Sequence, residues 1–184
     1  LPETATMGIG HTRWATHGEP STRNAHPHTF GDITLVHNGI IENYLELKKS
    51  IDASKLLSET DSEVLAGVIN TFYQQSHDLL EAVKSALALV KGTFGIAVLA
   101  RDTKDTIITA RRGSPILVGV GDKQNYIASD PSAIIDHTDK VVYLEDDQMA
   151  RITSKEVDIY DLKLNQAKAD VLTLDAVQHK ADLE

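Results

Sequence analysis

Apolar residues recur at intervals of three and four along two stretches in the middle of the chain, the spacing of one face of an α-helix. In the first stretch they are Val64, Leu65, Val68, Ile69 and Phe72. In the second, over residues 78–91, they are Leu79, Leu80, Val83, Leu87 and Val90. Thr60, followed three residues later by Glu63, is a capping-box pattern and predicts the start of the first of these helices.

Short runs rich in β-branched residues, divided by turn residues, predict strands. One run, residues 32–37, is followed by Asn38-Gly39, a dipeptide typical of turns, and helical spacing resumes from Ile40. The later runs are residues 93–99, 106–110, 116–120, 126–129, 141–144, 149–153 and 157–160. Helices placed between groups of short strands favour an α+β fold with antiparallel sheets over a doubly wound parallel sheet.

The length of 184 residues fits one domain. Because the periodic pattern weakens after Asp161, we expect a domain over residues 1–161 and a tail over 162–184 that is a linker or a partner-bound segment. Hydrophobic residues make up 41% of the chain, yet no apolar run approaches the roughly 20 residues that a membrane-spanning helix needs. Without a signal-peptide pattern either, the chain is expected to be cytoplasmic.

The charge balance and the absence of cysteine narrow the possible functions. A net charge of −9 disfavours a nucleic-acid-binding protein, which needs a basic surface. With no cysteine, the sequence has no disulfides, no cysteine-ligated metal and no thiol nucleophile. Glycine and histidine are concentrated in the first 40 residues, a composition typical of loops that carry a site.

Within this part, the segment 10–18 (Gly-His-Thr-Arg-Trp-Ala-Thr-His-Gly) places Arg13 on a short loop. A guanidinium suits a carboxylate ligand because it donates two parallel hydrogen bonds. Pairing of Arg13 with a nearby acid is an equally good interpretation of this residue alone. The two histidines of His26-Pro27-His28 could suggest a metal site. No carboxylate accompanies them at the spacing typical of metal ligands, so a structural role in a loop is favoured.

Two other segments offer complementary groups. The Asn38 amide and the Gly39 N–H, predicted at a strand-to-helix junction, could stabilise an oxyanion, although a simple turn explains the dipeptide as well. Asp61 could hold an ammonium group, or could serve only as part of an acidic helix start. Arg111 and Arg112 could bind phosphate, although two arginines at a strand end are more often a solvated edge. Together, Arg13, Asp61, Asn38 and Gly39 describe a site for a free amino acid whose side-chain carbonyl is polarised, as in the hydrolysis of glutamine.

Four segments then carry a family resemblance: residues 10–18, 24–28, 37–43 and 59–63. Over about residues 7–160 the chain resembles the glutaminase domain of the isomerising glutamine–fructose-6-phosphate aminotransferases, a class II glutamine amidotransferase domain. The resemblance implies an αββα sandwich of the N-terminal-nucleophile type, incomplete here at its N-terminus. It also implies L-glutamine as substrate, no metal or organic cofactor, a sugar-isomerase domain as partner and a homodimer or larger assembly.

The resemblance also assigns roles to residues of this sequence. Arg13 would bind the substrate carboxylate, Asp61 its ammonium group, and Asn38 with Gly39 the oxyanion. Thr16 and His17 would belong to a loop that closes over glutamine, and Trp14 would gate an ammonia channel. In that family the nucleophile is an amino-terminal cysteine whose own amine is the base.

Because these 184 residues lack that cysteine, we expect no glutaminase activity from them alone. Loss of early strands would also expose sheet edges and favour self-association or marginal folding. Two other functions remain open from the sequence: a non-catalytic amino-acid-binding module that keeps the Arg13 and Asp61 pocket, and a histidine-rich metal-binding protein.

Overall fold

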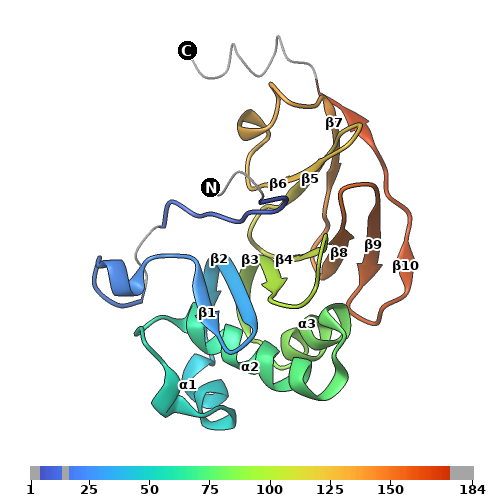
Figure 1. Cartoon of the computed structure of the whole chain (residues 1–184). Helices are drawn as coiled ribbons and strands as arrows, with labels where there is room; N and C mark the ends of the chain where they lie inside the picture. The colour runs from blue at the N-terminus through green and yellow to red at the C-terminus, as the bar shows by residue number, and fades with distance from the viewer. Residues whose placement is uncertain (1–4, 14–16, 175–184) are drawn as a thin grey trace.

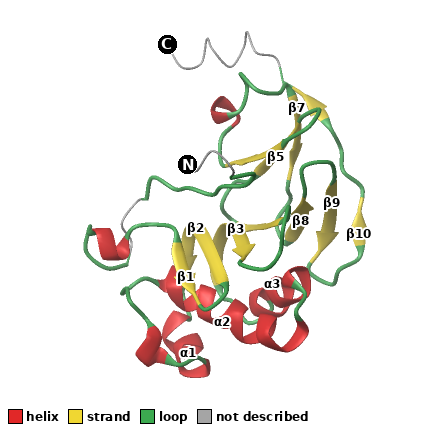
Figure 2. Cartoon of the chain, viewed as in Figure 1, coloured by secondary structure: helices red, strands yellow, loops and turns green. Residues whose placement is uncertain are grey.

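The computed structural model describes residues 5–13 and 17–174. These residues form two antiparallel β-sheets, with the α-helices gathered on one side of the larger sheet (Figures 1 and 2). Sequence analysis predicted an α+β fold with antiparallel sheets, and the strand pairing agrees with it. The cavity described below is lined by residues of β2 (Ile33–Ile41), β3 (Gly92–Ala100) and the start of α2 (Asp61–Ser76), where His37, Asp61 and Ser62 are buried.

The larger sheet has seven strands in the order β1-β2-β3-β4-β8-β9-β10. Their bounds are β1 His28–Phe30, β2 Ile33–Ile41, β3 Gly92–Ala100, β4 Ile107–Arg112, β8 Gln148–Ile152, β9 Val157–Asp161 and β10 Gln166–Ala167. The smaller sheet has the order β11-β7-β5-β6, with bounds β11 Leu172–Thr173, β7 Lys140–Tyr143, β5 Leu117–Val120 and β6 Asn125–Ala128.

Three α-helices connect β2 to β3: α1 Tyr44–Leu47, α2 Asp61–Ser76 and α3 Leu79–Leu87. Short 3₁₀ turns cover Thr22–Asn24, Lys48–Ser50, Ala53–Lys55 and Pro131–Ala133. The predicted start of α2 is confirmed, because the Thr60 hydroxyl accepts a hydrogen bond from the Glu63 N–H at 3.2 Å. Likewise, Asp78 caps α3 by accepting from the N–H of Glu81.

Apolar side chains form three groups that define the layers. The main core lies between α2, α3 and the larger sheet, and includes Leu65 and Leu35. A second group joins the two sheets, with Val118 of β5 and Val142 of β7 among its members. A third lies on the outer side of the smaller sheet, where Ile134 follows the turn Pro131–Ala133. The layers are therefore helix, sheet and sheet, and within the described residues a short turn takes the place of the second helical layer.

The structure corrects the prediction for residues 38–43. Asn38-Gly39 is not a turn at a strand-to-helix junction, because β2 continues to Ile41 and pairs with β3 through Gly92. The helical spacing from Ile40 was also misleading, since α1 begins at Tyr44. The physical reason is that the β-branched pair after Gly39 extends the ladder, and Gly39 stays within it at φ +137°.

The predicted boundary at Asp161 does not separate the following residues from the sheets. β10 pairs with β9, and β11 pairs with β7 of the other sheet. The Asp161 carboxylate accepts hydrogen bonds from the N–H groups of Lys163 and Asn165 and so fixes the turn into β10. Strands of two residues are too short to show a periodic pattern, and for this reason the sequence did not reveal them.

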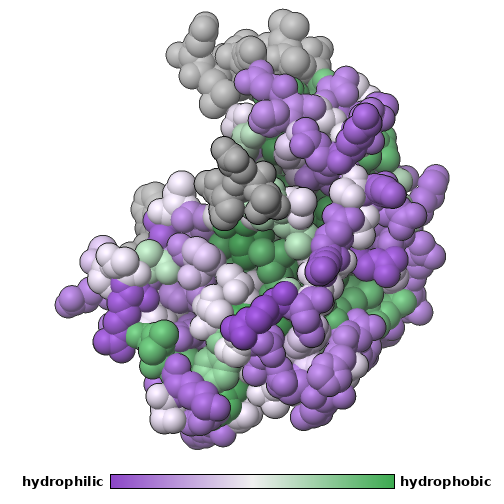
Figure 3. All heavy atoms as spheres, in the orientation of Figure 1, coloured by the Kyte–Doolittle hydropathy of each residue, from purple (hydrophilic) through white to green (hydrophobic). Residues whose placement is uncertain are grey.

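Apolar residues are exposed in a hollow near the middle of one face, and hydrophilic residues surround them (Figure 3). Large apolar side chains are also exposed elsewhere, among them Leu57 at 72% and Leu45 at 63%. β1 and β10 are the outer strands of the larger sheet among the described residues. No helix of the described part of the chain is long and apolar enough to cross a membrane.

Candidate functional site

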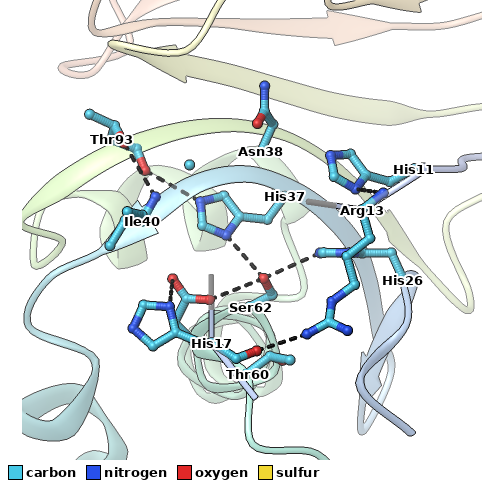
Figure 4. Close-up of a pocket in the computed structure, with 12 residues that line it drawn as sticks. His11, Arg13, His17, His26, His37, Asn38, Ile40, Thr60, Ser62 and Thr93 are labelled. Carbon is cyan, nitrogen blue, oxygen red and sulfur yellow. Dashed lines mark hydrogen bonds and ion pairs between the residues drawn. The ribbon is translucent and has the colours of Figure 1, made fainter. Parts of the chain in front are cut away.

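A cavity of about 250 Å³ lies where the segment before β1, the end of β2 and the first turn of α2 meet. Its lining residues are His11, Arg13, His17, His26, His37, Asn38, Gly39, Ile40, Thr60, Asp61, Ser62 and Thr93 (Figure 4). Pockets for drug-sized ligands have roughly 300–1,000 Å³, so this volume suits a ligand of amino-acid size. Arg13, Asn38, Gly39 and Asp61, which the sequence singled out separately, all line it.

A second cavity, of about 540 Å³, is a weaker candidate. It lies beside the start of β2 and the end of β3, and two of its charged residues, Asp32 and Arg101, form an ion pair at 3.4 Å. A third lining residue, Asp105, accepts hydrogen bonds from Ser154. Three of the four charged residues that line this cavity therefore already have partners.

Asp61 is the first residue of α2, and 3% of its surface is exposed. Its Oδ2 atom accepts a hydrogen bond from the N–H of Ile41 in β2 at 2.8 Å. Nδ1 of His17 lies 3.7 Å from the same oxygen. The positive end of the helix dipole stabilises a carboxylate at this position. Asp61 is thus a buried anion between α2 and β2, facing a cavity.

Arg13 lies across the cavity in a left-handed conformation, with φ at 58°. Its Nη2 donates to the carbonyl oxygens of His17 and Gly18 at 2.9 and 3.0 Å, and its Nη1 donates to that of Glu19 at 3.2 Å. Within the described residues no carboxylate lies in ion-pairing distance of it, so pairing with a nearby acid is not the role of this side chain. Three of the five N–H groups of a guanidinium are used, and two remain for a ligand.

Asn38 and Gly39 reach the cavity from within β2. Successive side chains of a strand point to opposite faces. His37 points toward Ser62, and the Asn38 amide points the opposite way (Figure 4). Gly39 must be glycine, because a Cβ atom would lie 2.3 Å from the carbonyl oxygen of Thr93 and φ is +137°. The missing side chain leaves the cavity open along the strand backbone.

Three histidines meet two hydroxyl groups at the start of α2, and the sequence did not predict this role. His37 Nδ1 lies 3.0 Å from Ser62 Oγ, and His26 Nε2 lies 3.3 Å from the same atom. His28 Nε2 lies 3.2 Å from Thr60 Oγ1. We call these five residues the histidine–hydroxyl cluster. The one available signal in the sequence was a histidine, His37, inside an otherwise apolar strand.

Burial keeps these imidazoles neutral. Desolvation is the main cause that lowers the pKa of His26 to about 3, with further lowering by the neighbouring His28 and His11. Desolvation also lowers the pKa of His37 and of His28, although the nearby carboxylates of Asp61 and Glu63 respectively act in the opposite direction. The same cause lowers the pKa of His11. Among the described residues no group of three or more histidines and carboxylates is arranged to hold a metal ion.

Arg111 and Arg112 lie outside this cavity. Arg111 pairs with Asp146 at 3.2 Å, and Arg112 pairs with Asp147 at 2.6 Å. Both guanidinium groups therefore have acidic partners and do not form an open phosphate site. Trp14 and Thr16, to which the family resemblance gave roles, lie outside the described residues.

Comparison with known proteins shows the family of the chain. A family described as "Glutamine amidotransferase domain" matches residues 2–175. The chain belongs to this family. It is 46% identical over 156 residues to the glutamine–fructose-6-phosphate aminotransferase (isomerizing) of Acinetobacter baylyi, an alignment that covers 84% of this chain and 26% of the relative. The enzyme of the same name from Chlorobaculum tepidum is 47% identical over 177 residues, or 93% of this chain and 29% of the relative.

The chain therefore spans less than a third of the length of these curated relatives. Among solved structures, glutamine phosphoribosylpyrophosphate amidotransferase from B. subtilis has a TM-score of 0.66 at 22% identity, covering 85% of this chain and 35% of that one. A structure described as the allosteric regulatory enzyme of purine biosynthesis has a TM-score of 0.60 at 23% identity, covering 78% and 32%. These structures share the fold of this chain, which agrees with the expected α+β sandwich of antiparallel sheets.

Proposed function

We propose that this chain is the glutamine-binding domain of an isomerising glutamine–fructose-6-phosphate aminotransferase. In the whole protein it would hydrolyse glutamine and supply ammonia for the conversion of fructose 6-phosphate to glucosamine 6-phosphate. The observation that carries the proposal is the convergence of Arg13, Asp61, Asn38 and Gly39 on one cavity of amino-acid size. The names of the two aminotransferase relatives support glutamine and fructose 6-phosphate as substrates of the whole protein.

In this proposal Arg13 and Asp61 bind the α-carboxylate and the α-ammonium group, which all free α-amino acids share. The free N–H groups of Arg13 bind the α-carboxylate, and the carboxylate of Asp61 binds the α-ammonium group. Such a pair favours a zwitterion, because a ligand that lacks either charge loses one of the two charge-assisted contacts. His17, beside Asp61, and Thr16 belong to the loop that closes over the ligand, and Trp14 gates the channel for ammonia.

The carbonyl of the glutamine side chain would lie near Asn38 and Gly39. The Asn38 amide and the Gly39 N–H would stabilise the oxyanion that forms when a nucleophile attacks this carbonyl. The family's chemistry needs a thiolate, and these 184 residues contain no cysteine. We therefore propose that these residues alone bind glutamine without hydrolysing it. The alternative is a non-catalytic amino-acid-binding module.

The remaining proposals concern the whole protein. Residues 162–184 would lead to a sugar-isomerase domain, which is the partner that receives ammonia. The intact protein would be a cytoplasmic homodimer or larger assembly. No metal or organic cofactor would take part in the hydrolysis of glutamine.

Isothermal titration calorimetry with L-glutamine tests the proposed function. The wild-type chain should bind L-glutamine, and Arg13→Ala should weaken binding by at least about tenfold through loss of a charge-assisted contact. Arg101→Ala, which removes an exposed guanidinium beside Asp32, is the matched control and should bind as the wild type does. Absence of any L-glutamine binding by the folded wild-type chain would contradict the proposal.

A second assay separates the enzyme domain from the binding module. The chain is mixed with a peptide that carries the amino-terminal cysteine segment of a curated relative, and glutamate release is followed. Activity that requires both the peptide and Arg13 supports an enzyme domain. If glutamine binds but the peptide restores no hydrolysis, the binding module is the better description.

A further inference from the structure

Ser62, the second residue of α2, is buried, and its hydroxyl oxygen has three polar neighbours. Nδ1 of His37 lies at 3.0 Å and Nε2 of His26 at 3.3 Å. Oδ1 of Asp61 lies at 3.4 Å. A hydroxyl has one proton, so it can donate to only one of these atoms. Which atom accepts this proton depends on which nitrogens of His37 and His26 are themselves protonated.

His37 fixes the choice through its other nitrogen. Nε2 lies 3.3 Å from the carbonyl oxygen of Thr93, which can only accept, so Nε2 carries a proton. Burial lowers the pKa of His37, and the neutral ring then has a bare Nδ1. Ser62 must therefore donate its proton to His37. The positive helix end at α2 also disfavours a second proton on this ring.

His26 completes the arrangement. Because the Ser62 proton points to His37, the Ser62 oxygen can accept from Nε2–H of His26. Nδ1 of His26 is buried and has no hydrogen-bond partner among the described residues. An unpaired buried acceptor is tolerated better than an unpaired donor, so this nitrogen is the bare one. The chain of donors then runs from His26 to Ser62, from Ser62 to His37 and from His37 to Thr93.

The consequence concerns Asp61. Its Oδ2 is held by the N–H of Ile41, and its Oδ1 lies 3.4 Å from the Ser62 oxygen, within reach of the hydroxyl. A hydroxyl that donates its one proton to Nδ1 of His37 does not donate it to this Oδ1. Oδ1 is thus left as an acceptor at the cavity. At the same time, Ser62 ties the first turn of α2 to β2 through His37 and to the segment before β1 through His26.

We propose that Ser62 is a positioning residue for recognition of the ligand's α-ammonium group: it keeps Asp61 at the cavity with Oδ1 unoccupied while it fastens the start of α2 to both histidines. This inference rests on the proposed function. It assigns no contact between Ser62 and the ligand. The effect on binding passes through Asp61, and it therefore depends on the ligand having an ammonium group.

Calorimetry with two ligands tests this dependence. L-glutamine has the ammonium group, and 4-carbamoylbutanoate is the same molecule without it. Ser62→Ala should weaken L-glutamine binding by about tenfold and change the affinity for 4-carbamoylbutanoate by less than about twofold. Ser62→Thr keeps the hydroxyl and should restore most of the L-glutamine affinity. Ser76→Ala, at the other end of the same helix, is the matched control and should affect neither ligand.

The outcomes separate the two proposals. If the wild-type chain fails to bind L-glutamine, the proposed function fails. If it binds and Ser62→Ala binds L-glutamine equally well, the positioning role alone is wrong. Equal weakening of both ligands would also overturn it, because Ser62 would then support the whole pocket rather than the ammonium subsite.

A measurement on the unmodified chain covers the case in which Ser62→Ala does not fold. Nitrogen-15 NMR distinguishes protonated from bare ring nitrogens. Both His26 and His37 should be protonated at Nε2 and bare at Nδ1 at neutral pH. A proton on Nδ1 of His37 would overturn the inference, because Ser62 would then be free to donate to Asp61.

Discussion

The starts of α2 and α3 share a sequence signature but differ in their surroundings. Each helix has a capping residue followed three positions later by a glutamate, and both caps form, although only the one at Thr60 was predicted from the sequence. At α2 the glutamate, Glu63, is 2% exposed and accepts hydrogen bonds from the N–H groups of Leu57 and Ser58. At α3 the side chain of Glu81 is 40% exposed and pairs with Lys84.

The first helical residue shows the same contrast. It is a buried aspartate, Asp61, facing a cavity at α2, and a buried leucine, Leu79, in the main core at α3. A capping pattern thus locates a helix start but does not say whether the start carries a site. At the start of α2, charged and polar side chains are buried and depend on specific hydrogen-bond partners. Buried groups of this kind are common at binding sites.

The largest expected effect is on folding. Glu63→Ala removes the acceptor of three hydrogen bonds, from the Leu57 N–H and from the N–H and hydroxyl of Ser58, and leaves the donors of the buried Ser58 without this partner. We expect the free energy of unfolding to fall by about 3–5 kcal/mol. Glu81→Ala, the same substitution at the equivalent position of α3, should cost less than about 1 kcal/mol, because its ion pair is partly exposed. Urea unfolding of both variants measures the difference, and equal losses would contradict the contrast between the two helix starts.

The second effect is on binding. Asp61→Asn removes the negative charge with little change in shape, so L-glutamine affinity should fall by about 30-fold or more, or at least about 2 kcal/mol. Leu79→Ala, at the equivalent position of α3, should instead lower the free energy of unfolding by about 2–5 kcal/mol and leave binding by the folded chain unchanged. Calorimetry and urea unfolding on both variants test whether the first residue of α2 serves binding and that of α3 serves stability. Binding of L-glutamine by Asp61→Asn as strong as that of the wild type would show that the negative charge of Asp61 does not contribute to binding.

A smaller effect follows from the buried histidines. The pKa of His26 is about 3 in the folded chain, against about 6.5 in an unfolded one. Between these values the unfolded state binds more protons, so His26 stabilises the folded chain fully above about pH 6.5 and loses this contribution as the pH falls toward 3. His26→Asn should therefore reduce the pH dependence of the free energy of unfolding between about pH 6.5 and 4. An unchanged slope in the variant would show that this imidazole is not kept neutral.

The smallest contrast is between the two capping residues. Thr60→Ala and Asp78→Ala should each lose about 1 kcal/mol of stability from the cap itself. Thr60→Ala should lose roughly 1 kcal/mol more, because its hydroxyl also contacts the hydroxyl of Ser58 and, within the histidine–hydroxyl cluster, His28. Thermal unfolding measures both. Identical losses would mean that the histidine–hydroxyl cluster contributes little to the stability of this helix start.

Local patterns were enough to predict the helices α2 and α3 and most strands, because each has a periodic apolar face. Residues 38–43 were misassigned, since Asn-Gly has the same composition in a turn and inside a strand, and only the pairing of Asn38 with Gly95 and of Gly39 with Phe94 in β3 decides between them. β10 and β11 were missed because two residues show no period.

The charged residues of the site were found by chemical complementarity, as Arg13 and Asp61 suit the two ends of an amino acid. The histidine–hydroxyl cluster was not found, because nothing in the sequence shows that His26, His37 and Ser62 approach one another. Such contacts depend on the packing of α2 against β1 and β2, and these segments are distant along the chain.

The central claim is that Arg13, Asp61, Asn38 and Gly39 form one pocket that binds glutamine as an amino acid. A crystal structure of the chain with L-glutamine at saturating concentration tests it most directly. The account predicts the α-carboxylate at the Arg13 guanidinium, the α-ammonium at Oδ1 of Asp61 and the side-chain carbonyl toward Asn38 and Gly39. Glutamine bound at a different place, or bound here with the ammonium group turned away from Asp61, would contradict it.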